Sequence, residues 1–197
     1  STPRIIRIQS GGADKWVAIF GAGGNGGAAT AYGSAVYLID IADGGRVLKK
    51  IDVADKAGNK VVNSVIASVV PVTPDTTSTA NYKGALVYFA DFESKLWKLN
   101  LTNKGTMYQL QQLFDGEATE NNGRRVFHDV TLSLDDNSDL WAFFGTGDRY
   151  NIADEDPKIK NRILAIKDTN YPSFKSGVSS ITAAKCKNVT SAGASCP

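Results

Sequence analysis

The sequence predicts an all-β protein, and two observations carry that prediction. Short runs rich in Val, Ile, Phe, Tyr and Trp recur about every ten residues between clusters of Gly, Asn, Asp and Ser, whereas helical periodicity is hard to find. Eleven expected strands leave no room in 197 residues for the crossover helices of a parallel sheet. The expected strands are Arg4 to Gln9, Trp16 to Phe20, Ala35 to Ile41, Val47 to Val53, Ser64 to Val72, Ala85 to Asp91, Lys95 to Leu101, Tyr108 to Phe114, Val126 to Leu134, Leu140 to Gly145 and Arg162 to Lys167.

A repeated unit refines this prediction. Each copy has a strand that ends in small residues, a turn, and a second strand that ends in Asp or Asn; the first strands contain Trp16, Leu86 and Trp141, which are 70 and 55 residues apart. Such a unit is typical of an antiparallel β-propeller blade with inserted loops. Three blades cannot close a ring of the usual four to eight, so we expect an incomplete propeller fragment over residues 1–183 and a Cys-containing tail over 184–197.

Several residue types have an expected structural role within the blades. Small residues allow inner strands to approach closely, which explains Gly21, Gly23, Gly145 and Gly147. The Asp or Asn that ends each second strand is expected to accept hydrogen bonds from the following backbone and start a turn, as at Asp40. The three tryptophans are expected to pack between blades, with ligand platforms as the alternative; they are Trp16, Trp97 and Trp141.

Composition removes several functional classes. The net charge is only +2, with no basic footprint for nucleic acid, and no apolar run approaches the roughly 20 residues of a membrane helix. The single histidine, His128, and two cysteines are too few for a typical zinc site, and they weaken mechanisms that need a histidine base. His128 is expected to be a packed or hydrogen-bonded strand residue, with a catalytic role as the alternative. No Ser or Cys nucleophile stands out to partner it, so no catalytic residue is assigned.

The two cysteines lie in the polar tail. Cys186 and Cys196 are ten residues apart, which suits a local disulfide in an exported protein, with free thiols as the alternative. The chain opens at Ser1 without an initiator Met or a signal-peptide pattern, so we expect a processed or excised piece of a larger protein.

A glycine-rich segment imitates a cofactor motif. Residues 21–26 match G-x-G-x-x-G after a strand, and Asp40 ends the next strand. The dinucleotide fingerprint needs a helix that opens at the third glycine, because its N-terminal amides hold the pyrophosphate. Residues 27–34 allow about two turns at most and reach a glycine, so a dinucleotide cofactor is not expected.

Two acidic clusters are candidates for cation binding. Asp135, Asn137 and Asp139 have the first spacings of a calcium loop, but Leu140 begins a strand at once and the late Glu is missing. A polar hairpin turn is therefore favoured, and any calcium bound at these three residues is expected to be weak. The cluster Asp154 to Asp156 is expected to be a solvated loop.

The motifs together identify a resemblance. Residues 15–23 (KWVAIFGAG), 35–41 (AVYLIDI), 86–101 and 141–150 (WAFFGTGDRY) resemble, in this order, the C-terminal propeller of the type IV pilus tip adhesins, the PilC/PilY family. The resemblance covers residues 3 to 170, and each piece alone also looks like a quinoprotein blade.

The resemblance implies a non-enzymatic protein at the pilus tip on the bacterial cell surface, exported through the periplasm. Its implied partners are minor pilins, the remaining segment of its own precursor, and a host or abiotic surface. The family's calcium loop is not carried over, because Asp75 is the only acid between Val72 and Ala85. Two alternatives stay open: a quinone-cofactor dehydrogenase propeller, and an envelope scaffold propeller that binds proteins by its edge strands.

Overall fold

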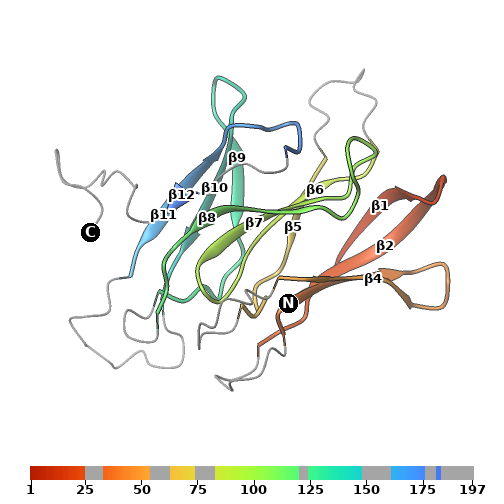
Figure 1. Cartoon of the computed structure of the whole chain (residues 1–197), viewed down its shortest axis with the longest axis horizontal. Coiled ribbons are helices and arrows are strands. Elements are labelled where there is room, and N and C mark those ends of the chain that lie inside the picture. Colours follow the sequence, from red (N-terminus) through yellow and green to blue (C-terminus); the bar gives the residue numbers. More distant parts are fainter. Residues whose placement is uncertain are drawn as a thin grey trace.

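The all-β prediction is confirmed. The computed structural model describes residues 1–24, 33–53, 63–73, 83–119, 124–147 and 161–175, and the backbone of 181–182. These ranges contain strands and no helix (Figure 1), so none of their segments is a helix long and apolar enough to cross a membrane. The strands are β1 (Arg4–Ser10), β2 (Ala13–Gly21), β3 (Ala35–Asp40), β4 (Arg46–Asp52), β5 (Val70–Val72), β6 (Leu86–Ala90), β7 (Lys95–Asn100), β8 (Leu110–Asp115), β9 (Thr131–Leu134), β10 (Leu140–Gly145), β11 (Ile163–Asp168) and β12 (Ile181–Thr182).

The strands form three sheets in chain order. The first sheet has the order β1-β2-β3-β4, the second contains β5-β6-β7-β8, and the third is β9-β10-β11, each with antiparallel neighbours. The residues expected to be equivalent, Trp16, Leu86 and Trp141, all lie on the second strand of their sheet. When the strands are aligned at Gly21 and Gly145, however, Trp141 takes the place of Val17, so Trp16 is one residue away from the equivalent position. One pairing departs from the expectation, because β12 lies parallel to β8 at the edge of the second sheet.

The second sheet is the middle layer of the described fold. All five residues of β6 are buried, because successive side chains point to opposite faces and both faces are covered. Val87 and Phe89 join the core formed with the first sheet, whereas Leu86, Tyr88 and Ala90 join the core formed with the third sheet. The side chains of β6 therefore pack against the first sheet on one face and against the third sheet on the other.

Two expected strands are longer than the real ones. Residues 64–69 and 126–130 are not strands, although Val65, Val69 and Val126 are buried. The first of these segments makes single backbone hydrogen bonds to separate parts of the fold instead of a ladder: Val65 N–H donates to Gly33 O, and Phe92 N–H donates to Ser64 O. The apolar side chains of this segment correctly indicate that it is buried. A buried segment need not pair with a neighbouring strand, and this one does not.

The polar residues that end the second strands of the repeat start turns, as the sequence predicts. Oδ1 of Asp40 accepts a hydrogen bond from Ala42 N–H at 3.1 Å, Asn100 Oδ1 accepts from Thr102 N–H at 3.0 Å, and Asp168 Oδ1 accepts from Asn170 N–H at 3.0 Å. In each case the acceptor lies two residues before the donor, which is the geometry of an Asx turn.

The expected role of the repeat glycines holds at one position only. A Cβ at Gly21 would lie 2.4 Å from Val65 O, so a close approach does require this glycine. Gly23 has φ +90 and no atom near its Cβ position, so its backbone conformation is what requires glycine. Among the described residues the nearest atom would be 3.9 Å away at Gly145 and none lies within 4 Å at Gly147, so no close approach within the described part of the chain requires these two glycines.

Candidate functional site

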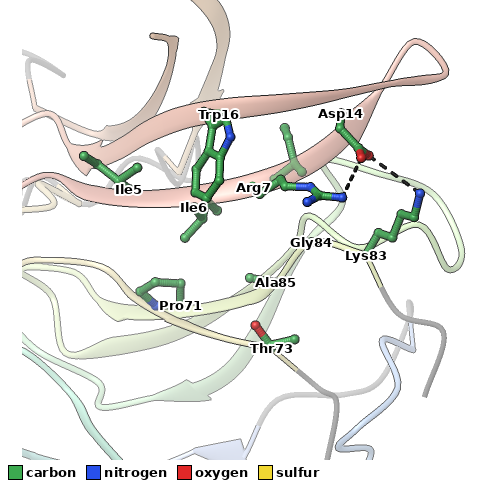
Figure 2. A pocket seen from close by; sticks show the side chains of 11 residues that line it. Ile5, Ile6, Arg7, Asp14, Trp16, Pro71, Thr73, Lys83, Gly84 and Ala85 are labelled. Atoms are coloured by element: carbon green, nitrogen blue, oxygen red, sulfur yellow. Dashed lines mark hydrogen bonds and ion pairs between the residues drawn. The ribbon is translucent and has the colours of Figure 1, made fainter. Parts of the chain in front are cut away.

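A groove runs along the outer edge of β1. Its volume is about 370 Å³. One wall contains four consecutive residues of β1, Ile5 to Ile8, with Asp14 and Trp16 of β2; the other wall contains Pro71, Thr73 and the consecutive residues 83–85 (Figure 2). Consecutive residues of a strand point to opposite faces, so a groove that touches all of them follows the backbone edge. We call it the β1 edge groove.

Charged side chains gather at one end of the β1 edge groove. Arg7 Nη2 lies 2.6 Å from Asp14 Oδ2, and Lys83 Nζ lies 3.8 Å from Asp14 Oδ1 (Figure 2). All three side chains are 37–53% exposed, so solvent reaches them. Two cations share one carboxylate here, which leaves this end of the groove with one excess positive charge.

Trp16 lines the β1 edge groove and is not a packing residue. Its side chain is 56% exposed, so the expectation that it packs between sheets is wrong. On β2 the buried side chains are Val17 and Ile19, and the strand's two-residue alternation places Trp16 on the opposite face. Figure 2 shows its ring extending from the hairpin toward the wall that carries Pro71. Trp97, in contrast, is partly buried against the first core.

The outer face of the third sheet is a second surface feature. Phe143 of β10 is 39% exposed and Ile163 of β11 is 90% exposed. Leu134, at the end of β9, is 44% exposed and lies at the rim of this face, because the register pairs it with the inner-facing Leu140. A shallow pocket lies on this face and is lined by Ser133, Leu134, Asp135, Trp141, Phe143 and Ala165. The inner-facing residues of β10, Leu140 and Phe144, are buried against the middle sheet instead. We call this outer surface the third-sheet face.

The candidate calcium residues form a hairpin turn between β9 and β10. The N–H groups of Asn137 and Asp139 donate to Asp135 Oδ1 at 2.9 and 3.0 Å, and Trp141 Nε1–H donates to Asp135 Oδ2 at 2.9 Å. Asp139 forms an ion pair with Lys167 on β11. The chain thus brings the three residues together, but both oxygens of Asp135 accept hydrogen bonds within the turn and Asp139 contacts a lysine. No group of three metal-ligating side chains was found among the described residues.

The same turn occurs between β6 and β7, where sequence reasoning did not find it. Glu93 and Lys95 N–H donate to Asp91 Oδ1 at 2.9 and 3.0 Å, and Trp97 Nε1–H donates to Asp91 Oδ2 at 2.8 Å. Ser94 has φ 65, as Ser138 has φ 63 in the other turn. Residues 91–97 (DFESKLW) and 135–141 (DDNSDLW) share the signature D-x-x-S-x-L-W, which could have revealed the equivalence.

The two aspartates have opposite pKa shifts, because only Asp91 is fully buried. Asp91 is fully buried, and loss of solvation raises its pKa to about 6, although Trp97 and Asn63 stabilise the carboxylate by hydrogen bonding. The hydrogen bond from Trp141 is the main cause that lowers the pKa of Asp135, because it stabilises the carboxylate. Loss of solvation is too weak to reverse this shift, because that turn is open to solvent. The two turns therefore share a backbone geometry, but the pKa values of their aspartates are shifted in opposite directions.

A buried ion pair joins the second and third sheets. Lys98 Nζ on β7 donates to Asp168 Oδ2 at 2.5 Å and to Ser173 O at 2.8 Å, and the Tyr88 hydroxyl donates to Asp168 Oδ2 at 2.7 Å. Lys98 and Tyr88 are 0% exposed. Burial lowers the pKa of Lys98 and raises that of Tyr88. Because the whole cluster is enclosed in the core, we assign it to holding the sheets together.

Other predicted residues have these positions. His128 is exposed in the irregular segment before β9, so the expectation of a packed strand histidine is wrong. Gly26 of the glycine-rich motif, Asp75 and the cluster Asp154 to Asp156 lie outside the described residues. The same holds for Cys186 and Cys196, whose disulfide stays a prediction.

Comparisons with family models, with curated proteins and with solved structures found no match to this chain.

Proposed function

We propose that the chain is a non-enzymatic part of a type IV pilus tip protein that supports pilus assembly and surface adhesion. On this proposal it is exported through the periplasm and displayed on the bacterial cell surface. The order of the sheets supports the proposal: the segments that resemble the pilus tip adhesins lie on the second and third strands of the first two sheets and on the second strand of the third sheet. Pilus assembly needs a protein that binds other proteins, and the described surface offers features suited to that role.

The observation that carries the proposal is the apolar third-sheet face. Phe143 and Ile163 expose large apolar side chains on the same side of the third sheet as Trp141. Covering apolar surface is favourable by about 25 cal/mol for each Å² removed from water. A contiguous apolar area on a sheet is therefore typical of a protein-binding surface.

The internal repeat indicates what covers this face. When the first and third copies are aligned at Gly21 and Gly145, Trp141 and Phe143 take the places of Val17 and Ile19. Val17 and Ile19 are 0% exposed, because they pack in the core that the first sheet forms with the second. The corresponding occupant of the third-sheet face is a further antiparallel sheet, which we assign to the remaining segment of the chain's own precursor.

This assignment connects folding to assembly. The completed tip protein, with the third-sheet face covered, is the form that minor pilins hold at the tip and that contacts a host or abiotic surface. A precursor that fails to cover the face keeps exposed apolar surface, and it is expected to aggregate or to be degraded before pili form.

The proposal is tested in the source bacterium. Deletion of the gene is expected to lower the number of surface pili and adherence, and removal of the retraction motor in the same cells is expected to restore the pili. The double variant Phe143→Thr and Ile163→Thr in the full precursor is expected to reduce pili in the same way, because Thr keeps strand propensity but removes apolar area.

The matched control is Val47→Thr, which changes a 53% exposed apolar residue on β4, away from the third-sheet face. It is expected to leave pili unchanged. Normal pilus number and adherence in the deletion strain would overturn the proposed function. Normal pili in the double variant, with a phenotype in the deletion strain, would overturn only the role of the third-sheet face.

A further inference from the structure

The backbone of β1 has an open edge. Among the described residues β1 pairs only with β2, so it is the edge strand of the first sheet. The hairpin closes through Gly11 and Gly12, with φ 63 and 80 and with Ser10 opposite Ala13. A two-residue loop of this kind closes on a hydrogen-bonded pair, and such pairs then alternate along the hairpin. The N–H and C=O groups of Ile6 and Ile8 therefore face β2, whereas those of Ile5 and Arg7 face outward.

An independent contact supports this alternation. Trp16 lies opposite Arg7, and the C=O of Trp16 accepts a hydrogen bond from Ile41 N–H at 3.1 Å. The Trp16 carbonyl thus points away from β1, as expected for a pair that exchanges no backbone hydrogen bonds. The backbone groups of Arg7 consequently point into the β1 edge groove.

On the opposite wall of the groove, β5 is poorly suited to pair with the backbone of β1. β5 is the edge strand of the second sheet, and Pro71 is the middle one of its three residues. Proline has no N–H to donate, and it protects an edge strand against pairing. The groove therefore has one wall that can form a ladder and one wall that offers an apolar surface, formed by Pro71 and Ala85, against which side chains can pack.

The side chains around the groove define the chemistry of its occupant. Arg7 and Lys83 share the single carboxylate of Asp14, so an added carboxylate would meet a positive end. The exposed ring of Trp16 provides an apolar platform in the same groove. Charge and shape thus complement an extended chain that has an acidic and an apolar side chain.

We propose that the β1 edge groove accepts an extended, acidic peptide strand of a partner protein, which adds to β1 by pairing with the backbone of Ile5 and Arg7. The partner's carboxylate binds Arg7 and Lys83, and its apolar side chain packs on Trp16. This inference rests on the proposed function for the identity of the partner, a minor pilin, but the binding itself is measured on the purified protein. Strand addition of this kind takes affinity from backbone hydrogen bonds and specificity from alternate side chains.

The test uses a fluorescein-labelled peptide of alternating Thr and Val with one central Glu. Fluorescence anisotropy is expected to show saturable binding to the purified chain. The double variant Arg7→Glu and Lys83→Glu is expected to weaken binding at least about tenfold through like-charge repulsion. Lys50→Glu is the matched control, because Lys50 also pairs with a surface carboxylate, Asp52, but lies on β4 outside the groove. That control is expected to bind the peptide as the unmodified chain does.

Amide hydrogen exchange by NMR separates strand addition from simple attraction between charges. The peptide is expected to protect the amides of Ile5 and Arg7, whereas Ile6 and Ile8 are protected already without it. The same peptide N-methylated along one edge is expected not to bind, because it lacks the backbone donors. A heparin oligosaccharide that binds equally well without protecting Ile5 and Arg7 would identify an anion site and overturn the proposal.

Two further results would also overturn it: no binding of the Glu peptide, or binding that the double charge reversal does not weaken. These outcomes are distinct from failure of the proposed function. Peptide binding and pilus number are measured separately, so a deletion strain with normal pili overturns the pilus role without touching the groove, and a groove that binds no peptide leaves the pilus result intact.

Discussion

Lys98 on β7 donates a 2.5 Å hydrogen bond to Asp168 at the end of β11, and this contact joins two sheets through the core. Both side chains are nearly inaccessible, with exposures of 0% and 3%. Tyr88 donates to the same carboxylate oxygen, so the buried negative charge has two side-chain donors. Removal of either charge leaves the other without compensation in the core.

We therefore expect Lys98→Met to lower the free energy of unfolding by about 3–5 kcal/mol, because the Asp168 carboxylate stays buried without its cation. Urea denaturation followed by tryptophan fluorescence measures the change. The double variant Lys98→Met and Asp168→Asn should recover part of the loss, since the neutral amide needs no cation and can still pair with the Tyr88 hydroxyl and the Asn170 N–H. A single variant as stable as the unmodified chain would contradict the assignment of this pair to sheet packing.

The two equivalent turns predict different titrations in one molecule. The indole N–H of Trp97 donates to Asp91 and that of Trp141 donates to Asp135, so each indole proton reports one carboxylate by NMR. We expect the Trp97 signal to shift with a midpoint at about pH 6, because burial raises the pKa of Asp91 to about 6. The Trp141 signal should shift at a lower pH than 3.8, because hydrogen bonds lower the pKa of Asp135. Midpoints that coincide would refute the effect of burial.

These shifts have opposite consequences for stability. The pKa of Asp91 is higher in the folded than in the unfolded chain, so its contribution is fully present below pH 3.8 and is lost as the pH rises through about 6. This loss is on the order of 3 kcal/mol. The contribution of Asp135 is present above pH 3.8 and is lost as the pH falls through its lowered pKa. Thermal unfolding of the variant Asp135→Asn should be measured as a function of pH. The variant should keep the loss of stability at rising pH that Asp91 causes, and it should lack the loss at falling pH that Asp135 causes.

Two glycines at matching places in the repeat should respond differently to alanine. At Gly21 a Cβ would lie 2.4 Å from Val65 O and 2.5 Å from Val65 Cγ1, so Gly21→Ala should lower the free energy of unfolding by about 1–3 kcal/mol or more. At Gly145 the nearest atom would be 3.9 Å away, and Gly145→Ala should be neutral or stabilising by about 0.5–1 kcal/mol. Chemical denaturation of both variants measures these changes. An equal loss of unfolding free energy in the two variants would indicate that a close approach requires glycine at both positions.

Calcium binding at the β9–β10 turn is expected to be weak. A cation would compete with the Trp141 indole for Asp135 and with Lys167 for Asp139. Isothermal titration should find no half-saturation below about 10⁻⁴ M, and alanine at Asp135, Asn137 and Asp139 should abolish any heat. A submicromolar site that survives these three substitutions would place calcium elsewhere.

The fold class and the positions of most strands follow from local patterns in the sequence. Short runs rich in apolar and aromatic residues between turn residues predict β6, β7 and β10 closely, because such a run and its turn chemistry are local properties of the chain. The turn role of Asp40 was equally accessible, since its acceptor and donor are two residues apart. The strand predicted over Ser64 to Val72 is too long, because residues 64–69 are mostly buried but do not pair with another strand.

Local patterns do not predict which faces of the strands are covered or which distant residues meet, because both depend on how the sheets pack. Trp16 and Trp141 look alike in sequence, yet one lines the β1 edge groove and the other donates a hydrogen bond within a turn. The groove brings Lys83 to Arg7 across 76 residues of chain, and the ion pair joins Lys98 to Asp168 across 70. Such proximity depends on how the sheets stack, and no local pattern encodes it, because the packing of all three layers sets the distance between residues on different sheets.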